Sequence, residues 1–289
     1  RQMRIFLLKR LFLFLLFSCS TGLLAWAGGG PLPLGGRAWG VAGASLAFAD
    51  GWALWNNAGA LGGVRNRQVV VAYDLRFGMK GLQTMAAGYV QPLRKGVFGA
   101  SVGRFGDELY SENTLGVAYS RGWDNVTLGM KANYMAVAMS EVGVRHCATL
   151  EIGGTARLLP ELTLGFHAYN ITRSRLDQNT GERLPTVLRL GVSYKPLEKI
   201  VLNAETEKDI LFPASLRLGV EYEAVHNLRL RTGFASRPQT VTFVIGFSPK
   251  RLQLDYAVRT HPVLGLSHHV SIGWSLNRRK KDTEIESRN

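Results

Sequence analysis

One phrase occurs twice in this sequence and restricts the fold more than any other feature. Leu188-Arg-Leu-Gly-Val-Ser-Tyr194 returns as Leu216-Arg-Leu-Gly-Val-Glu-Tyr222. In both copies large apolar residues alternate with small or charged ones, so an extended chain places the apolar side chains on one face. Similar phrases recur from about residue 67 to residue 276. The repeat therefore predicts a sheet of many antiparallel strands with one apolar face.

The alternating pattern divides this region into about fourteen strands, and an even number is typical of a bacterial outer-membrane barrel. No apolar stretch after residue 27 is long enough for a helical membrane span. We therefore predict an all-β fold, a transmembrane antiparallel β-barrel over residues 67–277. A soluble secreted β-sandwich is the competing fold, because its strands would alternate in the same way. The expected strands are 67–77, 81–91, 96–105, 113–121, 125–138, 146–158, 161–171, 186–195, 199–207, 214–224, 227–235, 239–248, 250–259 and 267–276.

The connections give the barrel an orientation. Those after even-numbered strands are short and those after odd-numbered strands are longer on the whole, which is typical of short periplasmic turns and longer outer loops. Both ends of the barrel are then expected in the periplasm. Tyrosine and tryptophan near strand ends predict an aromatic girdle at the lipid interface. These residues are Tyr89, Tyr119, Trp123, Tyr194, Tyr222, Tyr256 and Trp274.

The chain ends indicate export. Basic residues precede the apolar run 11–17, and Ala25-Trp26-Ala27 follows, so residues 1–27 resemble a secretory signal peptide cleaved after Ala27. An uncleaved anchor and lipoprotein processing at Cys19 are the alternatives. The formal net charge of +14 includes a basic tail, residues 278–289, expected in the periplasm. Because an exported chain with scattered basic residues meets no genome, we expect no nucleic-acid partner. The predicted location is the outer membrane of a Gram-negative bacterium, with outer-membrane lipids as partners.

The segment between the signal peptide and the first strand, residues 28–66, does not have the pattern of a strand. It is rich in glycine and alanine, which permit close backbone approach. A barrel of about fourteen strands has room for such a segment in its lumen. We therefore predict that residues 28–66 form an N-terminal plug or hatch.

This segment resembles the N-terminal signature of the FadL-like outer-membrane superfamily, and in particular its PorV/PorQ-related branch. The signature is G-x-R-x-x-G-x-x-G-A-x-x-A-x-A-D, then an aromatic residue, then N-P-A-x-x-L. The matching residues are Gly35, Arg37, Gly40, Gly43, Ala44, Ala47, Ala49, Asp50, Trp55, Asn56, Ala58 and Leu61. The resemblance implies a barrel with an N-terminal hatch in which these residues act as plug or gate. It also implies one of two functions, conduction of hydrophobic molecules or attachment to the type IX secretion machinery.

One departure concerns Asn57, which stands where the family usually has proline. Loss of the proline frees φ and restores a backbone donor, so the turn is expected to be less rigid than in relatives.

Arginines on the predicted lumen face form the other group of candidate residues, Arg189, Arg217, Arg229 and Arg231. They would bias the lumen toward anions or pin the plug through carboxylates. The simpler reading is neutralisation by Glu205, Glu207, Glu221 and Glu223 in the same register.

No catalytic motif, cofactor site or metal site is present in the sequence. His268 and His269 are neighbours on a predicted strand, so their side chains should point to opposite faces. Ser267, His269 and Asp255 are the nearest approach to a hydrolase triad, and nothing in their spacing requires one. Cys147 is the only cysteine after residue 27, so we expect no disulfide within the mature chain.

We therefore expect no enzyme but a passive outer-membrane channel or transport protein for a hydrophobic small-molecule ligand. The alternative is a PorV-like interaction component of a type IX protein secretion system, with a secretion-system protein as its partner and no solute transport of its own. A purely structural membrane protein is a third reading.

Overall fold

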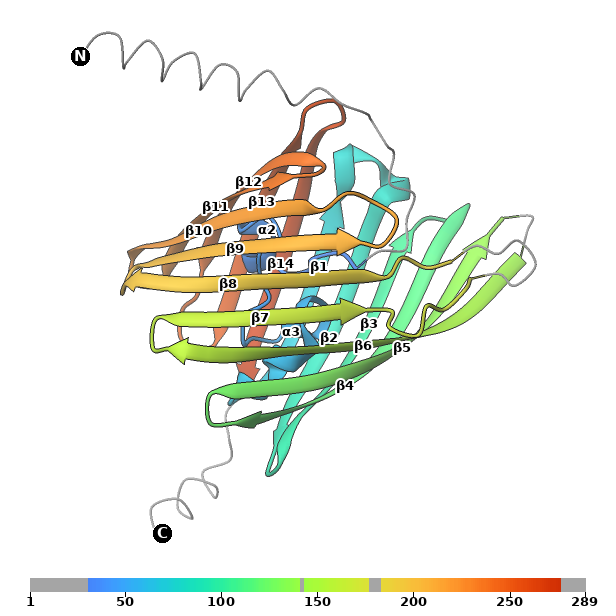
Figure 1. Cartoon of the computed structure of the whole chain (residues 1–289). Helices are drawn as coiled ribbons and strands as arrows, with labels where there is room; N and C mark the ends of the chain where they lie inside the picture. Colours follow the sequence, from blue (N-terminus) through green and yellow to red (C-terminus); the bar gives the residue numbers. More distant parts are fainter. Residues whose placement is uncertain (1–30, 141–142, 177–182, 277–289) are drawn as a thin grey trace, which may run out of the picture.

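The computed structural model describes residues 31–140, 143–176 and 183–276. Fourteen strands form one closed antiparallel barrel, in which each strand pairs with its neighbours in sequence and β1 pairs with β14 (Figure 1). The predicted fold class is confirmed. The expected signal peptide and basic tail lie outside the described residues. The strands are β1 (Arg67–Leu75), β2 (Gln83–Leu93), β3 (Gly96–Gly106), β4 (Tyr110–Trp123), β5 (Val126–Met139), β6 (Gly143–Leu159), β7 (Leu162–Tyr169), β8 (Val187–Leu197), β9 (Ile200–Asp209), β10 (Ser215–Val225), β11 (Leu228–Ser236), β12 (Gln239–Phe247), β13 (Leu252–His261) and β14 (Gly265–Leu276).

The outer face of the wall is apolar, and the inner face carries polar and small residues together with some buried aliphatic ones. In β8, Leu188 and Leu190 are exposed on the outside, whereas Arg189 between them is buried in the lumen. The repeated phrase in β10 behaves in the same way, with Leu216 and Leu218 outside and Arg217 inside. All seven aromatic residues expected in the girdle are exposed on the outer surface. The large apolar side chains of the wall are therefore exposed on the outside, whereas those of a soluble β-sandwich would be buried.

Some strand ends differ from those expected. The first strand ends at Leu75 rather than at residue 77, because Arg76–Gly78 forms a 3-10 turn (η2) in which Phe77 has a φ of 53°. A second short turn, η3 (Lys80–Leu82), follows before β2. The seventh strand ends at Tyr169 rather than at residue 171, since Asn170 has a φ of 52°. Left-handed backbone geometry, which strand periodicity does not reveal, stops both strands.

Connections at one end of the barrel are uniformly short, and those at the other end are uneven. The short ones are 94–95, 124–125, 160–161, 198–199, 226–227 and 248–251. At the opposite end the connection between β7 and β8, residues 170–186, is long. The connections 107–109 and 262–264 are brief, because β3, β4, β13 and β14 extend further than expected. The predicted difference between the two ends thus rests mainly on the 76–82 and 170–186 connections.

A segment before β1 fills the inside of the barrel. We call residues 34–64 the luminal segment. It contains α2 (Gly36–Gly40), α3 (Ala53–Asn56) and the 3-10 helix η1 (Ala58–Gly63), and the ribbon places α2 and α3 within the ring of strands (Figure 1). Nearly all of its residues are buried. Among the described residues, no helix is both long and apolar enough to cross a membrane.

Candidate functional site: the occupied lumen

The luminal segment approaches the wall so closely that glycine is required on one side or the other. A β-carbon added to Gly40 would lie 2.7 Å from Cβ of Arg231 on β11. Gly43 has a φ of 90°, and its amide donates to the carbonyl oxygen of Ala38 at 2.8 Å, so this glycine ends α2 in a left-handed turn. The signature glycines are therefore explained by backbone geometry and close packing.

A group of buried charges joins α2 to β10, β11 and β13. The Arg37 guanidinium donates to both carboxylate oxygens of Glu221, at 2.9 and 2.8 Å. Arg231 donates to Glu221 and to Asp255, each at 2.8 Å. Glu221 thus links an arginine of the luminal segment to an arginine of the wall. Arg37 also lies 3.5 Å from Asp50; burial raises the pKa of Asp50, and the Arg37 charge acts in the opposite direction.

A second charged group lies on β8, β9 and β10. Arg189 is 3.4 Å from Glu205, and Arg217 is 2.5 Å from Glu207. Glu205 also accepts a hydrogen bond from the backbone amide of Ser45 at 3.0 Å, and Arg189 donates to the backbone oxygen of Asn56. These wall residues both neutralise each other and hold the luminal segment.

Arg229 differs from the other lumen-facing arginines. Its side chain is 40% exposed near the end of the barrel and lies 3.2 Å from Glu223, which is 31% exposed. Within the described residues it makes no hydrogen bond or ion pair with the luminal segment, so it belongs to the rim rather than to the site.

A third buried charged group, on β5, β6 and β7, was not found from the sequence. Glu151 accepts a hydrogen bond from Asn133 at 2.5 Å and shares another with His167 at 2.9 Å, and Lys131 lies 3.9 Å away. His167 also contacts Arg189 at 3.2 Å, which joins this group to the second one. The alternation that places these residues in the lumen is visible in the sequence, and it is the only signal that could have identified them.

Asn57 holds the turn between α3 and η1 by hydrogen bonds. Its side-chain amide donates to the carbonyl oxygens of Leu46, at 2.7 Å, and Gly154, at 3.1 Å, and its side-chain oxygen accepts from the Gly59 amide at 3.1 Å. Its φ of −166° lies far from the value that proline requires, and its own amide bonds to Ala53 at 3.0 Å. Asn57 thus makes several hydrogen bonds that link the segment to itself and to the wall. Whether its turn is less rigid than in relatives stays a prediction.

Asn56 closes the luminal segment on itself. It accepts a hydrogen bond from the amide of Leu34 and donates one to the carbonyl oxygen of the same residue, at 3.1 and 2.9 Å. The start of the segment is thereby fixed to the end of α3.

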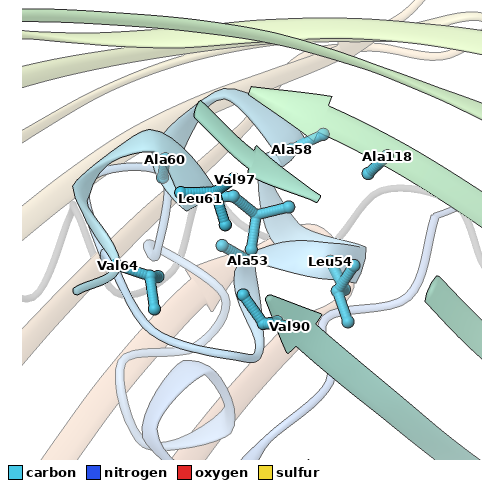
Figure 2. Packing of buried hydrophobic residues seen from close by; sticks show 9 residues of the cluster. All are labelled: Ala53, Leu54, Ala58, Ala60, Leu61, Val64, Val90, Val97 and Ala118. Carbon is cyan, nitrogen blue, oxygen red and sulfur yellow. The ribbon is translucent and has the colours of Figure 1, made fainter. Parts of the chain in front are cut away.

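The lumen on the side of β1–β4 is mainly apolar around the luminal segment. Leu54 and Leu61 of the luminal segment pack against Val90, Val97 and Ala118 of the wall (Figure 2). A neighbouring cluster joins Leu34 and Trp52 to Val70, Ala72 and Ala86, and Trp55 packs against both clusters. The luminal segment therefore lies between a charged part of the lumen, along β5–β13, and a mainly apolar part along β1–β4.

Two further apolar features lie near this mainly apolar part. On the outer surface over β1–β5 is an open groove of about 740 Å³, whose lining includes Tyr73, Met85, Val102, Leu115 and Tyr134. At the loop end of the lumen, the connection after β7 places two leucines against β5 and β6. That apolar cluster consists of Met135, Val137, Cys147, Leu176 and Leu184, with Tyr110 and Met139 beside it.

The predicted plug residues thus all lie in the luminal segment, and their role in gating stays a prediction. His268 and His269 do point to opposite faces: the first bonds to Tyr256 on the outside, and the second is fully buried in the lumen. Ser267, His269 and Asp255 form no triad, because both ring nitrogens of His269 lack a partner and Asp255 is bonded to Arg231 and Gln253. Within the described residues no three His, Cys, Asp or Glu side chains are placed to hold a metal ion.

The geometry defines a fourteen-stranded barrel whose lumen is filled by the segment preceding its first strand. No family model and no curated protein matches the sequence. Solved structures of the same fold include the toluene transporter TbuX of Ralstonia pickettii, with a TM-score of 0.71 and 11% identity over 84% of this chain and 98% of that one. The monoaromatic hydrocarbon channel CymD gives a TM-score of 0.66 with 11% identity, over 87% of this chain and 100% of that one.

The toluene transporter TodX of Pseudomonas putida is also similar, with a TM-score of 0.53 and 12% identity over 76% of this chain and 91% of that one. At these identities the similarity concerns the fold alone, and membership of the FadL-like superfamily stays a prediction. Membership of the PorV/PorQ branch stays a prediction.

Proposed function

We propose that this protein is a bacterial outer-membrane barrel that mediates passive passage of a hydrophobic small molecule, and that the luminal segment is its plug. The observation that carries this proposal is the occupied lumen: an apolar outer wall encloses a segment that lies between a charged part of the interior and a mainly apolar part. The shared fold with hydrocarbon transporters agrees with it.

The route for such a solute follows from the division of the lumen. A path through the Arg37, Glu221 and Arg231 group would require an apolar molecule to displace paired, buried charges, which is costly. The side lined by β1–β4 requires the separation of apolar contacts around Leu54 and Leu61. We place the route there, with the Met135 and Leu184 cluster as the first apolar surface that a solute entering at the loop end meets.

A reversible cross-link tests whether the luminal segment has to move. A β-carbon built on Gly51 lies 3.6 Å from Cβ of Gln68 on β1, within the range of about 3.5–4.5 Å found in disulfides. Gly51→Cys with Gln68→Cys, in a Cys147→Ser background, therefore fixes the segment to the wall when oxidised. Uptake of radiolabelled toluene is measured in cells that have an intact outer membrane and no other hydrocarbon transporter.

We expect the unmodified chain to raise toluene uptake, the oxidised double mutant to lose this increase, and reduction to restore it. The Cys147→Ser parent, treated with the same oxidant, is the control. Uptake no greater than in cells without the protein would refute the proposed function. Uptake that is unchanged by oxidation would refute the movement of the segment alone.

The PorV-like alternative stays a prediction with no observation on the described residues in its favour. Recovery of a stoichiometric protein partner from outer membranes, together with absence of solute uptake, would favour it over the proposed function.

A further inference from the structure

Arg259 is an inward-facing arginine with no partner of opposite charge among the described residues. It makes neither an ion pair nor a hydrogen bond there, and its buried Nε has no acceptor. The charged groups that act on it most are Arg76, Arg217 and Asp74. Arg76 and Arg217 repel it, whereas Asp74 is engaged 3.4 Å from Arg76. The charge of Arg259 is therefore left uncompensated.

The neighbours of Arg259 hold it in place rather than neutralise it. Its guanidinium carbon lies 4.1 Å from the centre of the Trp39 ring, and the His269 ring stacks on Trp39 at 4.8 Å with an angle of 21°. Trp39 is itself fixed by a hydrogen bond from its indole nitrogen to the carbonyl oxygen of Pro33 at 2.9 Å. The guanidinium plane is thus oriented by an aromatic surface that accepts a cation but removes none of its charge.

His269 adds a second unsatisfied group beside this arginine. It is fully buried, and neither of its ring nitrogens has a partner. Across the β1–β14 pairing it lies opposite Asp74, whose Oδ1 is also without a partner. Buried polar atoms normally have hydrogen-bond partners. The unpartnered nitrogens of Arg259 and His269 therefore indicate a place for a bound hydrogen-bond acceptor, whereas the Asp74 oxygen, itself an acceptor, does not.

The surroundings of the cluster indicate an apolar body on that group. Two partly exposed phenylalanines lie near the neighbours of this cluster. The amide of Phe77 bonds at 3.2 Å to Ser267, which lies opposite Arg259 in the β13–β14 pairing, and the Arg76 guanidinium lies 5.6 Å from the centre of the Phe105 ring. A planar guanidinium fork matches a carboxylate, and one unpaired cation matches a single negative charge.

We propose that Arg259, with His269 beside it, binds the carboxylate of a small aromatic monocarboxylate at the loop end of the lumen. The inference rests on the proposed function only for its biological role, as it extends the substrate class from neutral hydrocarbons to their carboxylated relatives. Binding itself does not depend on passage through the barrel.

Calorimetric titration of the purified full chain in nanodiscs tests this with benzoate as the probe. We expect saturable binding of benzoate and no binding of the neutral analogue benzamide. Because a hydrogen bond to a charged group contributes about 1.5–3 kcal/mol, Arg259→Gln should weaken benzoate binding by roughly 10-fold to 100-fold. Arg229→Gln, which removes a half-exposed arginine of the rim, is the matched control and should bind as the parent does.

Arg259→Lys gives a second variant in case the glutamine variant fails to fold, as judged by heat-modifiable gel migration. It keeps the charge without the fork, so its affinity should fall between those of the parent and the glutamine variant. The proposal would be overturned if an Arg259 variant bound benzoate as tightly as the parent, or if the parent bound benzamide as tightly as benzoate. It would also be overturned if benzoate gave no heat of binding, which would leave water alone in the site. Toluene uptake without benzoate binding would refute this site and leave the proposed function intact. Benzoate binding without toluene uptake would refute the proposed function and leave this site intact.

Discussion

Glu221 offers a sharp test of how the luminal segment is held, because one carboxylate joins Arg37 of the segment to Arg231 of the wall. Glu221→Gln keeps the size of the side chain and removes its charge. Loss of one partner from a buried pair costs about 3–5 kcal/mol. Since Arg37 retains Asp50 and Arg231 retains Asp255, we take the lower end, about 3 kcal/mol, which is roughly a 100-fold rise in the population of the detached segment.

Thiol labelling measures that population. In a Cys147→Ala background, Ala38→Cys places a thiol on α2 at a position that is 1% exposed, so a maleimide reacts only when the segment detaches. Glu221→Gln should raise the labelling rate by roughly 100-fold. Glu223→Gln is the matched control, two residues along the same strand and facing the same lumen, and its half-exposed pair with Arg229 contributes at most about 1 kcal/mol. Equal labelling rates in the two variants would show that the buried charges do not hold the segment.

Two further predictions concern packing and the turn at Asn57. Asn57→Pro should destabilise the luminal segment more than Asn57→Ala, because both lose the side-chain hydrogen bonds and only proline also requires a φ far from −166°. The thiol-labelling rate reports both variants. Equal rates would show that the φ of residue 57 does not contribute to holding the segment. Gly99→Ala should cost about 1–3 kcal/mol of stability, since its added β-carbon would lie 2.4 Å from Cδ2 of Leu54. Gly103→Ala on the same strand and face meets nothing nearer than 3.8 Å and should unfold in denaturant like the parent.

Much of the barrel is predictable from sequence because its physical cause is local. Alternation with a period of two residues assigns Leu188 and Leu190 to the outside and Arg189 to the inside without knowledge of any other strand. Even the pairing of Glu221 with Arg231 follows from hairpin register, since they lie directly opposite in β10 and β11.

The rest depends on contacts between segments far apart in the chain. Nothing local to Asn57 reveals that its side chain reaches Gly154, and nothing local to Arg189 reveals that it reaches the backbone of Asn56. The left-handed geometry of Phe77 likewise shortens a strand whose periodicity continues. Sequence patterning therefore predicts which face a residue occupies, whereas its partner in the lumen depends on how the luminal segment is seated.

The luminal segment contacts both strands that complete the barrel. The Gly36 amide bonds to Ser271 on β14 at 2.8 Å, and the Gly51 amide bonds to Gln68 on β1 at 2.7 Å. These two strands are the most distant in sequence, so bringing them together carries the largest loop-closure entropy of any pairing in the wall. A segment that binds both reduces that cost, and it precedes every strand in the chain. We therefore expect it to serve during biogenesis as a template on which the first and last strands meet.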